Sequence, residues 1–67
     1  MHTREVNKND QIKQQIIELL KEKGNLAFGD LIQELSLPYE AVLKNVLELK
    51  RQGLIEKRQE NGHFALL

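Results

Sequence analysis

Residues 38–55, PYEAVLKNVLELKRQGLI, decide the fold of this chain. Val42, Val46 and Leu49 are four and three residues apart, which places them on one face of a helix. Proline suits the first turn of a helix, where its missing N–H is not needed, and glycine suits the position just past the end. The stretch therefore predicts a helix from about Pro38 to Gln52 that buries one apolar face.

The residues that follow this helix predict a β-hairpin. The first expected strand runs from Leu54 to Gln59, and the second from His63 to Leu67. Asn61-Gly62 between them is a strong signal for a two-residue type I′ turn, because both central positions of that turn need positive φ. The register that follows from this turn pairs Gln59 with Phe64 and Lys57 with Leu66.

Two further helices are expected before residue 38. Apolar side chains recur at helical spacing from about Asp10 to Lys23, and a shorter apolar face follows from about Gly29 to Leu35. The second helix ends at Ser36-Leu37-Pro38, since the residue before a proline is pushed out of the α region. Between the two helices, Asn25 to Phe28 form a short apolar connection with strand-like pairing expected at Leu26 and Ala27.

The expected architecture is α+β and mainly α: a three-helix bundle with a C-terminal two-stranded hairpin. A chain of 67 residues makes one domain. We assign residues 1–9, which are polar and aperiodic, to a flexible N-terminal arm, and residues 10–67 to the domain. The alternative is a bundle whose tail happens to alternate, and Asn61-Gly62 argues against it.

The composition limits the classes of partner. Ten basic and ten acidic residues cancel, whereas nucleic-acid binders usually carry a basic excess. From Tyr39 to Arg58, however, five basic residues stand against three acidic ones. The chain has no cysteine and no apolar stretch long enough to span a bilayer, so a cytoplasmic location without a membrane partner is the expectation.

The order of elements resembles the winged helix-turn-helix family, over Asp10 to Leu67. The most specific part is Val42…Val46…Leu49…Gly53-Leu54-Ile55, which is similar to the end of that family's recognition helix and the start of its wing. LIQELSL at 31–37 is similar to the family's second helix and turn.

This resemblance implies a DNA-binding module, a transcriptional or plasmid-type regulator whose partner is duplex DNA. In DNA-binding members the recognition helix enters the major groove and basic residues of the wing contact the backbone. A homodimer would double the contacts and match a two-fold operator. The residues that the resemblance assigns to DNA are Tyr39, Lys44, Asn45, Arg51, Lys57 and Arg58.

The expected groove-facing side of the third helix departs from the family pattern. Glu40 would repel phosphate, and Leu43 and Leu47 cannot hydrogen-bond a base edge, although a leucine can touch a thymine methyl. With Tyr39, these leucines widen the apolar arc of the helix to about 160°, beyond the roughly 100° that core packing requires. Either these three side chains pack under the second helix or against the wing, or they form an exposed patch for a partner protein or a second copy, or they face bases directly.

Residues that would indicate catalysis are missing. His2 and His63 lie apart without a carboxylate cluster, and the glycines form no phosphate-binding loop. We therefore expect neither an enzyme nor a metal or cofactor site.

Overall fold

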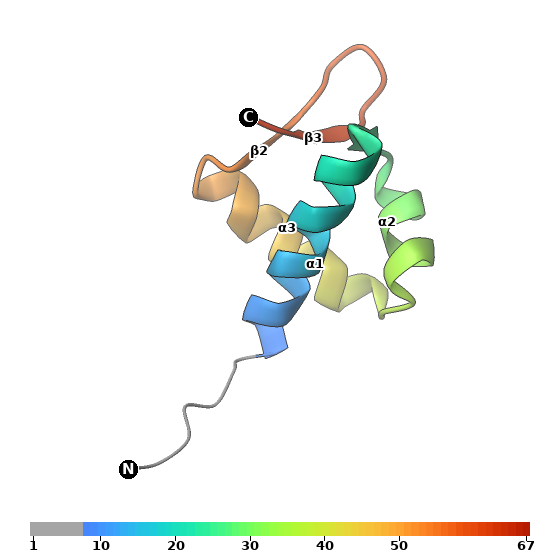
Figure 1. The fold of residues 1–67 in the computed structure, drawn as a ribbon, viewed down its shortest axis with the longest axis vertical. Coiled ribbons are helices and arrows are strands. Elements are labelled where there is room, and N and C mark those ends of the chain that lie inside the picture. The colour runs from blue at the N-terminus through green and yellow to red at the C-terminus, as the bar shows by residue number, and fades with distance from the viewer. Residues whose placement is uncertain (1–7) are drawn as a thin grey trace.

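The computed structural model of the chain describes residues 8–67. Three helices pack with a small sheet, which lies at the end of the molecule opposite the start of α1 (Figure 1). The elements, in chain order, are α1 (Lys8–Lys23), β1 (Asn25–Leu26), α2 (Phe28–Leu35), α3 (Tyr39–Arg51), β2 (Ile55–Lys57) and β3 (Phe64–Leu66). This confirms the expected mainly helical α+β class.

The first helix begins earlier than the sequence pattern predicted. α1 starts at Lys8 and not at about Asp10, so two residues assigned to the arm belong to the domain. The earlier start has a tertiary cause, because the side chain of Asn9 accepts a hydrogen bond from Asn45 of α3. The rest of the expected arm, residues 1–7, lies outside the described residues.

A tight turn joins α2 to α3. Ser36 closes α2 in the left-handed conformation, with φ 54°, and its N–H donates to the carbonyl of Ile32. Pro38 is the N-cap of α3, with extended backbone, and not part of the first turn as expected. Its carbonyl accepts the first helical hydrogen bond, from Val42. The turn therefore sets α3 across α2 without a long loop.

Gly53 ends α3 as predicted. Its φ is +80°, which a glycine adopts without steric cost. The N–H of Gly53 donates to the carbonyl of Lys50 (3.1 Å) and that of Leu54 to Leu49 (3.0 Å), the paired bonding of a Schellman motif. The chain leaves this motif directly into β2, with Ile55 buried.

The sheet has three strands, one more than the expected hairpin, in the order β1-β3-β2. β1 pairs antiparallel with β3, Asn25 facing Ala65 and Leu26 facing Phe64. The strand-like pairing expected at Leu26 and Ala27 thus exists one residue earlier. Through β1, the hairpin is joined to the link between α1 and α2.

The predicted register of the hairpin is wrong by two residues. Lys57 faces Phe64 and Ile55 faces Leu66, and the strands are shorter than expected. No type I′ turn forms, because Gly62 has positive φ (+72°) while Asn61 does not. The N–H of Gly62 instead donates to the carbonyl of Arg58, which closes a four-residue loop. A shift of two residues keeps every side chain on its expected face.

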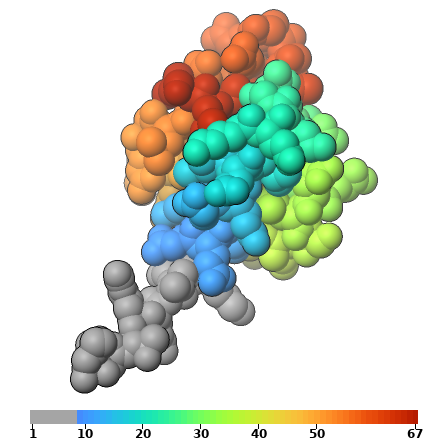
Figure 2. Space-filling view, viewed as in Figure 1, coloured from blue at the N-terminus to red at the C-terminus, as the bar shows by residue number. Residues whose placement is uncertain are grey.

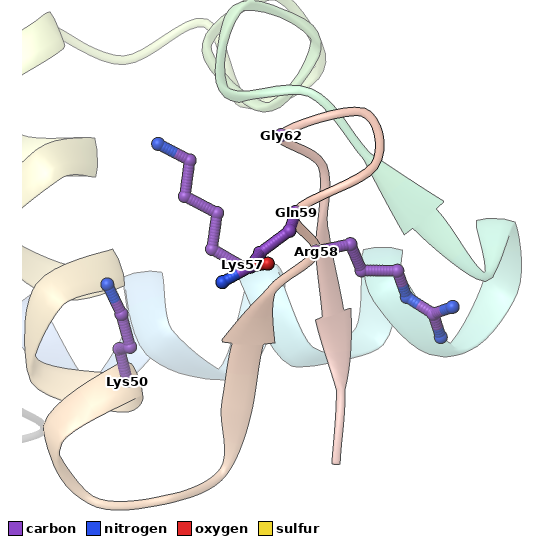
Figure 3. A pocket seen from close by; sticks show the side chains of 5 residues that line it. All are labelled: Lys50, Lys57, Arg58, Gln59 and Gly62. Carbon is purple, nitrogen blue, oxygen red and sulfur yellow. The ribbon is translucent and has the colours of Figure 1, made fainter.

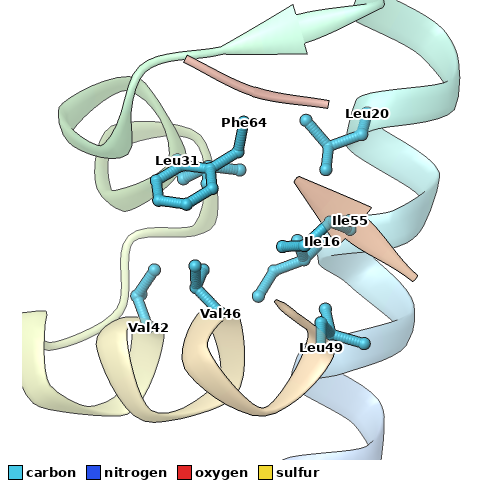
Figure 4. Close-up of a cluster of buried hydrophobic side chains, with 8 residues drawn as sticks. All are labelled: Ile16, Leu20, Leu31, Val42, Val46, Leu49, Ile55 and Phe64. Atoms are coloured by element: carbon cyan, nitrogen blue, oxygen red, sulfur yellow. The ribbon is translucent and has the colours of Figure 1, made fainter. Parts of the chain in front are cut away.

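The core is one cluster to which every helix and both strands of the hairpin contribute (Figure 4). Val42, Val46 and Leu49 of α3 are at most 1% exposed, which confirms the predicted apolar face. The side chains that surround them are Ile16, Leu20, Leu31, Ile55 and Phe64. This packing holds α3 with its opposite face toward solvent.

We expect Leu49→Ala to lower the free energy of unfolding by about 2–5 kcal/mol, because it leaves a cavity in this cluster. Leu47→Ala, two residues away on the exposed side, should change it by no more than about 0.5 kcal/mol. Urea denaturation followed by circular dichroism measures both. Equal losses would mean that the two faces of α3 are assigned wrongly. If Leu49→Ala has no folded baseline, Ile16→Val, expected to cost about 0.5–1.5 kcal/mol, replaces it.

Candidate nucleic-acid interface

The outer face of α3 carries apolar and basic side chains together. Tyr39 is 58% exposed and Leu47 is 51% exposed, while Leu43 is half-buried. The exposure of Leu47 argues against packing of this side chain under α2 or against the hairpin, whereas Tyr39 is exposed but does contact α2. The ring of Tyr39 is fixed by an edge-on contact with Phe28 of α2, their centroids 5.2 Å apart.

Basic side chains of α3 and the hairpin line two separate hollows. Lys44 and Arg51 are exposed, and with Leu47 they line an open hollow on α3. Lys50 and Lys57 line a second hollow, between the end of α3 and the hairpin. Figure 3 shows the Lys50 and Lys57 side chains on the same side of the hairpin. Sequence reasoning missed Lys50, and its position in the last turn of α3, beside Arg51, was the available signal.

Arg58 also lines the hollow of Lys50 and Lys57, but its side chain extends away from theirs (Figure 3). Its side chain extends from the other side of the hairpin from Lys57 (Figure 3), as adjacent residues at the end of a strand do. Arg58 is half-buried, and its Nε has no hydrogen-bond partner among the described residues. The Lys57 and Arg58 side chains therefore leave the hairpin in different directions.

Asn45 does not belong to the interface, contrary to the sequence-based prediction. Its side chain is 0% exposed. Nδ2 donates to the carbonyl of Ala41 (2.7 Å) and to Oδ1 of Asn9 (3.3 Å), so the amide joins α3 to the start of α1. The prediction failed because helical position separates Asn45 from Lys44 by about 100°. That rotation turns Asn45 toward α1 and Lys44 toward solvent.

Glu48 carries a carboxylate in the hollow formed by Lys44, Leu47 and Arg51. Lys13 of α1 forms an ion pair with it. The hydrogen bond and the charge of Lys13 hold the pKa of Glu48 below its ordinary value of 4.5, and the charges of Lys44 and Arg51 lower it further. Lys13 thus offsets the negative charge of Glu48, which lies in the same hollow as Lys44 and Arg51. Glu40, at the start of α3, is the exposed acid of this face.

The hairpin loop is held at a defined place by polar side chains. The N–H of His63 donates to Oδ1 of Asn61 (2.9 Å), and His63 Nδ1 lies 2.7 Å from Oδ1 of Asn25 in β1. Because Oδ1 can only accept, the bond requires the proton on Nδ1. In Figure 2 the hairpin forms one end of the molecule, above α1.

Other surface features of the described residues carry no comparable charge or chemistry. The outer face of α1 has an open hollow lined by Gln11, Gln14, Gln15 and Glu18, without a basic side chain. Within residues 8–67, no three histidines or carboxylates come together as metal ligands. Over the same range, no helix has the length and apolar character needed to cross a bilayer.

The fold and the basic outer face of α3 define the class of protein. Three helices with a sheet-borne hairpin beside the third helix form a winged helix. The model of the winged helix-turn-helix DNA-binding family matches residues 9–56. The chain belongs to this family, as its resemblance implied.

Two individual proteins are similar to this chain, one in sequence and one in structure. An uncharacterised protein of Methanocaldococcus jannaschii is 38% identical over 52 residues, which cover 78% of this chain and 43% of that protein. The crystal structure of T. acidophilum IdeR is similar with a TM-score of 0.61 and 29% identity, and covers 97% of this chain. This chain spans 43% of the curated relative and 30% of the IdeR chain.

Lys44 and Asn45 provide a matched pair for testing which side chains contact DNA. We expect Lys44→Ala to weaken binding to duplex DNA by up to about 10-fold in moderate salt, because one phosphate contact is lost. Asn45→Ala should leave affinity unchanged, since the amide is buried. Fluorescence anisotropy with a labelled duplex measures both. A larger loss for Asn45→Ala, with its unfolding free energy unchanged, would return that residue to the interface.

The Lys13–Glu48 pair makes a pH-dependent contribution to stability. The folded-state pKa of Glu48 is depressed, so this contribution is complete above the ordinary pKa of 4.5 and disappears as the pH falls through the lower folded-state value. We expect Lys13→Met to be less stable than the wild type at neutral pH, with a difference that vanishes in acid. Urea midpoints across the pH range measure this, with Lys21→Met as the control. A difference that does not change with pH would contradict the ion pair.

Proposed function

We propose that this chain is the DNA-binding domain of a transcription regulator that places α3 in the major groove and the hairpin against the phosphate backbone. The family and fold are those of winged-helix DNA-binding proteins. The proposed role is binding, without catalysis. It retains Tyr39, Lys44, Arg51 and Lys57 from the sequence-based assignment and adds Lys50. Asn45 is left out because it is buried, and Arg58 because it extends from the opposite side of the hairpin.

One observation carries the proposal: in a chain with no net charge, pairs of cations line two hollows, one on α3 and one between the end of α3 and the hairpin. Lys44 and Arg51 line the first hollow, together with Leu47, and Lys50 and Lys57 line the second. The nearest carboxylate, that of Glu48, is paired with Lys13. These four cations attract a polyanion although the formal net charge of the chain is zero, and Glu40, the exposed acid of α3, opposes that attraction.

The number of cations sets the expected salt dependence. Four phosphate contacts release counterions so that the logarithm of the binding constant falls with the logarithm of salt at a slope of about −3.6. Between about 50 and 200 mM salt, affinity should then fall roughly 100-fold. Fluorescence anisotropy with a short mixed-sequence duplex measures this slope.

Two single variants separate the site from the general charge of the chain. Lys57→Gln should reduce the magnitude of the slope by about 1. Lys21→Gln removes the same charge from the outer face of α1 and should leave the slope nearly unchanged. Absence of binding at low salt, or equal effects of the two variants, would overturn the proposal.

We further infer that two copies bind together on a two-fold site. Four contacts give one domain a modest affinity, and a symmetric pair doubles the phosphate contacts and fits the half-site spacing of one helical turn. The slope then doubles on a palindromic duplex, to about −7. A slope that stays near −3.6 on such a duplex would assign binding to single copies.

A further inference from the structure

The apolar strip of α3 is defined by Tyr39, Leu43 and Leu47. These residues are spaced at four-residue intervals, so they lie along one side of the helix. Core packing does not explain why these three residues are apolar, because Val42, Val46 and Leu49 already form the buried face of α3. About half of the Leu47 side chain stays exposed in the folded chain, so its apolar surface is still in contact with water.

The surroundings of the strip point to its occupant. Lys44 and Arg51 line one hollow with Leu47, and Lys50 and Lys57 line a separate hollow between the end of α3 and the hairpin. An apolar side chain beside cations complements a partner in which an apolar group lies close to anions. The major groove of duplex DNA has this form at A·T pairs, where the thymine methyl lies between the phosphate backbones.

We propose that Leu43 and Leu47 recognise thymine methyl groups in the major groove, so that the domain selects thymine-containing steps by apolar contact. The inference rests on the proposed function. Four residues advance about 6 Å along a helix, and two base-pair steps advance about 6.8 Å. The two leucines therefore reach thymines about two steps apart. Lys44 and Lys50 supply affinity that does not depend on sequence, while the leucines supply the selection.

The test compares two duplexes that differ only in the methyl group. The first is an alternating A–T duplex, which places thymines two steps apart on each strand, and the second carries deoxyuridine at every thymine. We expect the wild type to bind the thymine duplex about 10-fold more tightly, for two buried methyl groups. Anisotropy titrations in the same buffer measure the ratio of the two affinities.

Variants show whether the leucines cause the preference. Leu47→Ala should reduce the ratio to about 3-fold, because one of the two methyl contacts is lost. Leu43→Ala should reduce it to the same degree, and circular dichroism confirms that each variant is folded. Leu47 is exposed, so Leu47→Ala is informative even if Leu43→Ala does not fold. Lys57→Gln is the matched control, because it should weaken binding to both duplexes and keep the wild-type ratio.

The outcomes separate this inference from the proposed function. Equal, salt-dependent binding of both duplexes would overturn methyl recognition and leave DNA binding intact. A thymine preference that Leu47→Ala retains in full would also overturn it. Absence of binding to either duplex at low salt would remove the proposed function and this inference together. Wild-type self-association that Leu47→Ala abolishes, without a thymine preference, would assign the strip to a second copy of the chain.

Discussion

The packing of Val42, Val46 and Leu49 against the other helices is the contact on which the rest of the structure depends. These side chains are almost completely buried, and they fix both the position of α3 and its rotation about its own axis. Rotation determines which residues face solvent, because neighbours on a helix differ by about 100°. The same contact therefore excludes Asn45 from the surface and presents Lys44 and Leu47.

Local signals in the sequence predict most of this architecture. The apolar periodicity of α3 and its end at Gly53 each depend on residues that are close together in the sequence, and the structure confirms both predictions. The hairpin register was missed because two local signals compete at residues 61–62. Asn61 uses its side chain to accept a bond from His63 instead of adopting positive φ, and the loop lengthens to four residues. Sequence spacing alone does not indicate which of these bonds forms.

Local sequence signals predict only part of the candidate interface. Lys44, Arg51 and Lys57 follow from their places on a helix and a strand. Asn45 was misassigned because its partner, Asn9, is 36 residues away along the chain. The separation of Lys57 from Arg58, and the approach of Lys50 to Lys57, depend on how the hairpin packs beside α3 (Figure 3). Such relations arise from tertiary packing, and one sequence carries little information about them.

The central claim is that core packing turns the basic and apolar outer face of α3, together with one side of the hairpin, toward DNA. An NMR titration of the isotopically labelled domain with a short duplex, at low and at high salt, tests it most directly. We predict shifts that cluster at Lys44, Leu47, Lys50 and Lys57 and that collapse when salt is raised. Shifts that cluster instead on the outer face of α1, around Gln14 and Glu18, would contradict this account.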